Sequence, residues 1–131
     1  MLDLSSNLLE SCPDLSATPA IVRLDISRNF IPSLAPLDGQ LPALQRVDAR
    51  GNSLASTHGL GRLPSLKSVD LGENLLSNTD ALRDLIGARS LGELWIDGNP
   101  LCTLGRRSTG GRKDNAFERR GGGAGDVYNG T

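Results

Sequence analysis

The stretch from Leu66 to Leu76, LKSVDLGENLL, decides the fold of this chain. It follows the pattern L-x-x-L-x-L-x-x-N-x-L, in which Val69 and Leu71 alternate with polar residues. Alternation of this kind predicts a short strand with one buried face. A single short strand buries too little surface to be stable, so the pattern requires neighbouring copies that share a core.

The same pattern recurs along the chain. It fits again from Ile21, from Leu44 and from Leu91, and an incomplete copy opens the chain at Leu2. The asparagines of the five copies are Asn7, Asn29, Asn52, Asn74 and Asn99. An asparagine side chain both donates and accepts hydrogen bonds, so we expect each one to satisfy backbone groups where the chain turns off its strand.

These copies are similar to the leucine-rich repeats of the intracellular 22-residue class, over residues 1–102. The resemblance implies an α/β solenoid with about five short parallel strands on its concave face. The strands are expected near residues 3, 25, 48, 70 and 95. The segment that leads from one strand to the next, which we call a return, is expected to run along the convex side. Leucines recur there every three or four residues, which predicts short 3₁₀ or α-helical turns.

The longest return lies before the last copy. Asn78 or Thr79 is expected to cap a helix there, with Leu82, Leu85 and Ile86 on one face and its end at Gly87.

The composition divides the chain near residue 104. Residues 1–104 form the predicted leucine-rich-repeat domain, whose first repeat is incomplete. Because no polar cap precedes that repeat, the sequence is expected to be a fragment or a shortened gene model. Residues 105–131 are rich in glycine and arginine and predict a disordered basic tail. Residues 1–102 carry eight basic and twelve acidic side chains, so their net charge is -4.

The cysteines and the hydropathy pattern predict a compartment. Cys12 and Cys102 do not make a disulfide framework, and Cys12 is expected to be a small buried residue. The opening residues lack the basic and apolar regions of a signal peptide, and no apolar run approaches the roughly 18 residues of a membrane span. An intracellular location, cytoplasmic or nuclear, and no membrane partner are therefore predicted.

The polar residues of the strands are expected to point outward on the concave face, the usual binding surface of repeat proteins. Their central column is predicted to hold four aspartates and then a tryptophan, with arginines that offset the repulsion between the aspartates. The residues predicted to contact a partner are Arg23, Asp25, Arg46, Asp48, Arg50, Asp70, Glu73, Glu93, Trp95 and Asp97.

Two alternatives stay open for this surface. The aspartates are common in the repeat class, so they can be a feature of the scaffold and not of a binding site. The indole of Trp95 is an interface anchor if it is exposed, but a core residue if it packs under a terminal cap.

The predicted function is that of a non-catalytic protein–protein interaction module, an adaptor or regulatory protein. His58 is the only histidine, and no catalytic triad, metal-ligand set or phosphate-binding loop is discernible, so neither enzymatic activity nor a cofactor is expected. The alternative is an RNA-associated role, because residues 91–102 resemble the last repeat of the nuclear mRNA export receptor family. Nucleic acid would then bind through the basic tail, an outcome that the acidic repeat domain does not favour.

Overall fold

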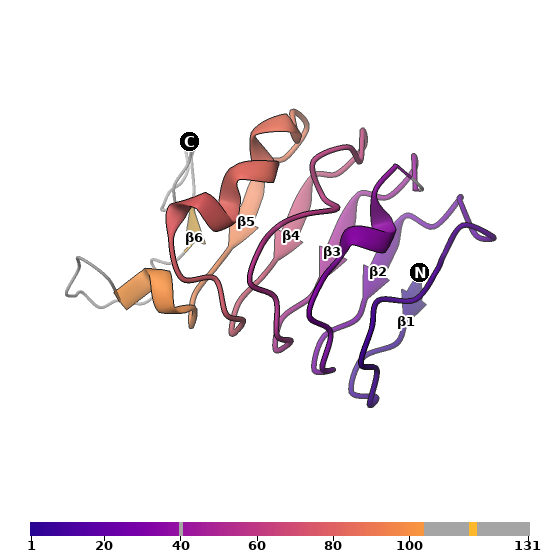
Figure 1. Ribbon diagram of the computed structural model, residues 1–131. Coiled ribbons are helices and arrows are strands. Elements are labelled where there is room, and N and C mark those ends of the chain that lie inside the picture. Colours follow the sequence, from indigo (N-terminus) through magenta and orange to yellow (C-terminus); the bar gives the residue numbers. More distant parts are fainter. Residues whose placement is uncertain (40, 104–115, 118–131) are drawn as a thin grey trace.

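The computed structural model describes residues 1–39, 41–103 and 116–117. Its main feature is a sheet to which each sequence copy contributes one short parallel strand (Figure 1). The parallel strands are β1 (Leu2–Asp3), β2 (Arg23–Asp25), β3 (Arg46–Asp48), β4 (Ser68–Asp70) and β5 (Glu93–Trp95). The prediction of five parallel strands near these positions is confirmed.

The apolar residue at the middle of each strand sets the register of the sheet. Leu24, Val47, Val69 and Leu94 are Cα partners on successive strands, and all four are buried. A shift of one residue would turn this whole set toward solvent, so the alternation fixes both the pairing and the buried face.

The core between the sheet and the returns is aliphatic. Leucines dominate it, and neither Trp95 nor Phe30 belongs to it. Cys12 packs into this core with 6% of its surface exposed, and burial raises the pKa of its thiol to about 11. The prediction that Cys12 is a small buried residue is therefore confirmed.

The returns lie across the core from the sheet, in front of it in Figure 1. The returns before β3 and β5 contain 3₁₀ helices, and a third 3₁₀ helix follows β5. The returns before β2 and β4 consist of turns and bends, so the helical turn that the leucine spacing predicted before β4 is not present. The helices are η1 (Ala35–Leu37), η2 (Thr79–Gly87) and η3 (Pro100–Thr103).

Helix η2 shows where the sequence-based expectation was wrong. Asn78 caps it as predicted, since its side chain accepts a hydrogen bond from the backbone N–H of Ala81. Leu82 is buried and Leu85 partly buried, but the side chain of Ile86 is 83% exposed. A 3₁₀ helix has three residues per turn, so positions three apart share a face and Ile86 points away from it.

A sixth strand, β6 (Ala116–Phe117), was not predicted. It pairs antiparallel with β5, with Ala116 opposite Trp95 and Phe117 opposite Leu94. Apart from these two residues, the predicted disordered tail at 105–131 lies outside the residues that the structure describes.

Candidate partner-binding surface

In β2, β3 and β5 the first residue is exposed and the third is partly buried, and we call the surface formed by these residues, together with Asp3, Ser68 and Asp70, the sheet face. Its central column runs Asp3, Asp25, Asp48, Asp70 and Trp95 in consecutive register, as predicted. The neighbouring column runs Arg23, Arg46, Ser68 and Glu93, also in register.

The aspartates of the central column have a structural role. The Oδ1 atom of each accepts a hydrogen bond from the backbone N–H two residues further on, at 2.9 Å for Asp3, 3.0 Å for Asp25, 3.3 Å for Asp48 and 2.9 Å for Asp70. The carboxylate thus closes the turn at the end of its strand in the same way in four successive copies. This geometry supports the scaffold interpretation of the column.

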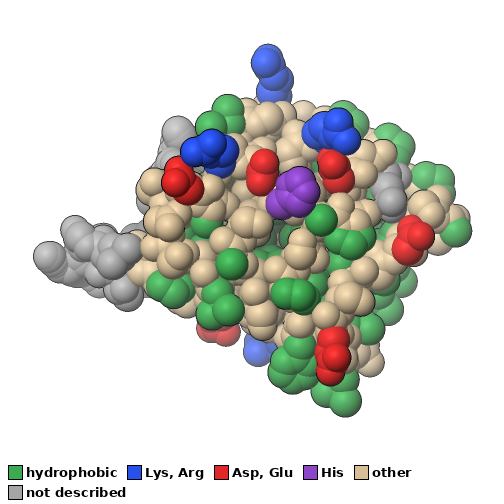
Figure 2. All heavy atoms as spheres, viewed as in Figure 1, with side chains coloured by type: hydrophobic (Ala, Val, Ile, Leu, Met, Phe, Trp, Pro, Cys, Tyr) green, Lys and Arg blue, Asp and Glu red, His purple; other side chains and the backbone are tan. Residues whose placement is uncertain are grey.

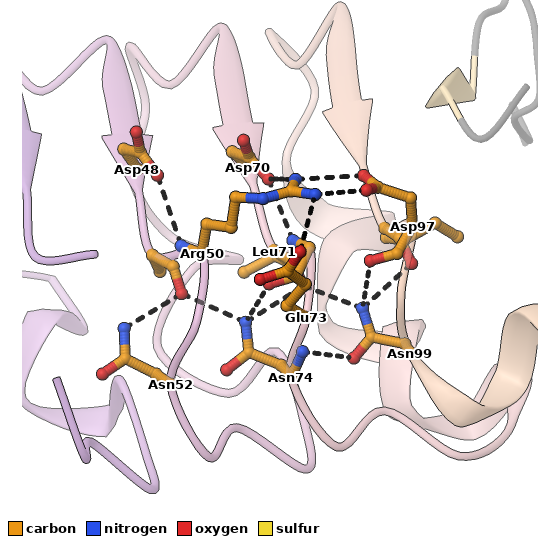
Figure 3. A network of polar contacts seen from close by, with 12 residues as sticks. Asp48, Arg50, Asn52, Asp70, Leu71, Glu73, Asn74, Asp97 and Asn99 are labelled. Carbon is orange, nitrogen blue, oxygen red and sulfur yellow. Dashed lines mark hydrogen bonds and ion pairs between the residues drawn. The ribbon is translucent and has the colours of Figure 1, made fainter. Parts of the chain in front are cut away.

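Four of the five predicted asparagines, Asn29, Asn52, Asn74 and Asn99, are buried and form a row of amides beneath that column, of which Figure 3 shows the last three. The side chain of Asn74 donates to the carbonyl oxygens of Ala49 and Leu71, both at 3.0 Å, and accepts from the backbone N–H of Leu54 at 3.0 Å. Asn52 and Asn99 make equivalent contacts. Each amide therefore joins its own turn to that of the preceding copy, as expected from its donor and acceptor groups.

Arg50 connects three copies of the repeat. Its guanidinium lies 3.2 Å from the carboxylate of Asp70 and 3.4 Å from that of Glu73. It also makes a two-pronged contact with Asp97, which is 47 residues further along the chain (Figure 3). The hydrogen bond to Asp97 is the largest reason why the pKa of Arg50 is raised. The structure thus brings together four of the ten predicted surface residues.

Gly72 makes this contact possible. A Cβ atom at this position would lie 2.2 Å from Nη1 of Arg50 and 2.7 Å from its Cζ, so any side chain would displace the guanidinium. Gly51 and Gly98 have a different role, because they adopt positive φ angles of 76° and 75° in the turn before the asparagine. Gly72 therefore leaves space for the side chain of a neighbouring copy, whereas Gly51 and Gly98 allow the turn itself.

Asp70 is the least exposed carboxylate of this network, with 21% of its side chain accessible against 26% for Asp97 and 55% for Glu73. Burial raises its pKa above the ordinary value, and the hydrogen bond from Gly72 and the charge of Arg50 offset only part of that effect. Arg50 stabilises the Asp70 carboxylate weakly, because it shares its charge among three partners and its two-pronged contact is with Asp97.

The other arginines of the surface make no direct ion pair. Arg23, Arg28 and Arg46 are exposed and lie within ion-pair distance of no acidic side chain of a described residue, whereas Arg50 contacts three. Arg23 and Arg46 are direct Cα partners on neighbouring strands. Like charges at such positions are destabilising, and this pair is left available to an external anion.

Trp95 ends the central column on β5. Its side chain is partly buried and is absent from the aliphatic core, so it lies at the surface of the sheet. Glu93 shares its strand and is exposed, without an ion pair to any residue in the described ranges. The part of the sheet face near β5 therefore combines an accessible indole with a free carboxylate.

The opposite face, which bears the returns, is shown in Figure 2. There the His58 ring is 60% exposed and lies 3.8 Å from Asp84, while Arg62 pairs with Asp38 at 2.9 Å and lowers the pKa of that carboxylate. Among the described residues, no group of three or more histidine, cysteine or acidic side chains is arranged to hold a metal ion. No helix in the same ranges is long and apolar enough to cross a membrane.

We expect a measurable coupling energy between Arg50 and Asp97. Both side chains are about a quarter exposed, so solvent screens the pair only in part. A double-mutant cycle of Arg50→Gln and Asp97→Asn should therefore give a coupling energy of about 1 kcal/mol. The matched control is the exposed pair Arg83 and Asp80, 3.2 Å apart, for which about 0.3 kcal/mol is expected. Equal coupling in the two cycles, measured by urea denaturation, would show that the network does not tie the copies together.

No protein-family model matches this chain, and no curated protein sequence matches it at a significant level.

Proposed function

We propose that this chain is a non-catalytic protein-interaction module of the leucine-rich-repeat class, an adaptor or regulatory protein that binds its partner on the sheet face. In this proposal the strands line the concave side of a solenoid, and the protein works inside the cell, in the cytoplasm or the nucleus. Two observations support the architecture: one parallel strand per copy, in register, and the row of asparagine amides that joins neighbouring copies.

The position of Trp95 carries the functional proposal. An indole offers a large apolar area that gains free energy when a partner covers it, and aromatic anchors of this kind dominate the energetics of protein interfaces. Two carboxylates nearby are exposed: Glu73 contacts Arg50 at 3.4 Å, and Glu93 makes no ion pair with a described residue, so this end of the face attracts a cation. A partner should therefore present an apolar residue beside lysine or arginine.

The contacts within the sheet face reduce the number of residues that are free to bind a partner. Arg50 and Asp97 bind each other, and the aspartates of the column close turns. The residues that we propose as direct contacts are Arg23, Arg46, Glu93 and Trp95.

A selection of random peptides displayed on phage tests this proposal and makes no assumption about the identity of the partner. We expect enriched peptides to carry an apolar residue next to a basic one, and to bind Trp95→Ala about thirtyfold more weakly than the wild-type chain, a loss of about 2 kcal/mol. Arg83→Ala, on the opposite face, is the matched control and should bind normally.

Peptides that bind Trp95→Ala as tightly as the wild-type chain would contradict the proposed site. A titration with single-stranded RNA tests the alternative, an RNA-associated role. Binding of RNA to the full chain that weakens steeply with salt, while the peptides show no dependence on Trp95, would favour the RNA-associated role.

A further inference from the structure

The free charges of the sheet face change sign from one end to the other. In the column that begins each strand, Arg23 on β2 and Arg46 on β3 are exposed cations, Ser68 on β4 is uncharged and buried, and Glu93 on β5 is an exposed anion. None of the three charged side chains has an ion-pair partner among the described residues.

The aspartates on the same strands do not cancel this polarity. Asp25 accepts two hydrogen bonds from Ser27, at 3.0 Å and 2.6 Å, and Asp48 accepts the backbone N–H of Arg50. Each carboxylate is thus held toward its own turn while the two arginines occupy neighbouring positions on paired strands. An acidic group placed between Arg23 and Arg46 would relieve their repulsion and pair with both.

From this arrangement we infer the chemistry and orientation of the partner: an extended segment that crosses the strands, with an acidic residue over β2 and β3 and an apolar residue, followed by a basic one, over β5. The inference rests on the proposed function and adds a second contact point to it. The apolar residue meets Trp95. The basic residue next to it faces the other way in an extended segment, so its charge is attracted to Glu93 without a direct contact.

Strand spacing fixes how far apart these partner residues lie. Neighbouring strands are about 4.8 Å apart, so the midpoint between β2 and β3 lies about 12 Å from β5. An extended chain advances about 3.3 Å per residue and turns alternate side chains to the same face. The acidic and apolar residues should therefore be four positions apart in the partner.

The test titrates the isotopically labelled full chain with the peptide acetyl-Glu-Ser-Gly-Ser-Leu-Lys-amide, which has this spacing. The side-chain NMR signals of the arginines and of the Trp95 indole report the two contact points separately. We expect the signals of Arg23, Arg46 and Trp95 to shift together, with a Kd on the order of 1 mM. Arg50, which is already paired, and Arg83, on the opposite face, should not shift.

The matched control peptide is acetyl-Glu-Leu-Ser-Gly-Ser-Lys-amide, of the same composition, in which the acidic and apolar residues are adjacent and cannot reach both points. It should bind about tenfold more weakly, and so should the first peptide to the Arg46→Glu variant. Arg83→Glu should have no effect.

The outcomes separate this inference from the proposed function. A shift of Trp95 without Arg23 and Arg46 would overturn the orientation and leave the interaction site in place. Shifts at Arg23 and Arg46 without Trp95 would contradict the proposed anchor. Equal binding of the two peptides, equal shifts at all exposed arginines, or no binding at millimolar concentration would overturn the inference.

Discussion

Replacing Gly59 by alanine is expected to lower the free energy of unfolding by about 4 kcal/mol, because Gly59 has the closest backbone contact of the glycines that the structure describes. A Cβ atom on Gly59 would lie 2.0 Å from the carbonyl oxygen of Leu34 and 2.5 Å from its carbonyl carbon. Both atoms belong to the backbone of the neighbouring return, which cannot move aside without disturbing buried leucines. Gly59 also adopts a φ of 105°, which disfavours any side chain.

Gly39 provides the matched control for this effect. It also has a positive φ, of 71°, but among the described residues a Cβ atom there would meet only the Arg62 side chain, at 3.8 Å. Gly39→Ala should therefore cost about 1 kcal/mol, from the left-handed backbone alone. Urea denaturation of the two variants measures the difference. If both variants lose the same free energy of unfolding, the clash with the backbone of Leu34 does not contribute, and this explanation for Gly59 is wrong.

Replacing Asn52 by alanine is expected to cost about 3 kcal/mol, because three buried backbone groups lose their partner at about 1 kcal/mol each. These groups are the N–H of Ile31 and the carbonyl oxygens of Ile26 and Ala49, at 3.0, 2.9 and 3.0 Å. Water cannot easily replace the amide, since Asn52 itself is only 8% exposed.

Asn7 holds the same place in the first copy but is exposed, and its side chain donates to the carbonyl oxygens of Leu4 and Ser5. Asn7→Ala should cost less than about 1 kcal/mol, because water can replace an exposed side chain. Thermal and urea unfolding compare the two variants. An Asn52→Ala protein as stable as Asn7→Ala would show that the amide row does not hold the copies together.

The strands and the asparagine row were predictable because both follow from periodic chemistry. Alternation around Val69 and Leu71 fixes one buried face, and a buried amide at each turn is the simplest way to satisfy backbone groups that the sheet leaves unpaired. The prediction for Ile86 was wrong because its exposure depends on the type of helix in that return, which has three residues per turn if it is 3₁₀ and 3.6 if it is α-helical.

The network around Arg50 was not predictable from single positions. Arg50 and Asp97 lie in copies that are not adjacent, and their contact crosses the copy between these two. It depends on Gly72 of that middle copy, which has no side chain in the way. One signal was present in the aligned copies: Arg50, Gly72 and Asp97 occupy the same position in three successive repeats. The long side chain of Arg50 passes over Gly72, which has no side chain, and reaches Asp97 in the next copy. This pattern is visible only when the copies are aligned with one another.

Trp95 is the only tryptophan in the chain, so its fluorescence tests the central claim directly. The measurement is acrylamide quenching of the full chain, free and saturated with a peptide whose binding has been established by calorimetry. If the sheet face is the binding surface, the bound peptide covers the indole, shifts its emission to shorter wavelength and lowers the quenching constant severalfold. A peptide that binds while the emission and the quenching constant of Trp95 stay unchanged would place the partner elsewhere and contradict the account.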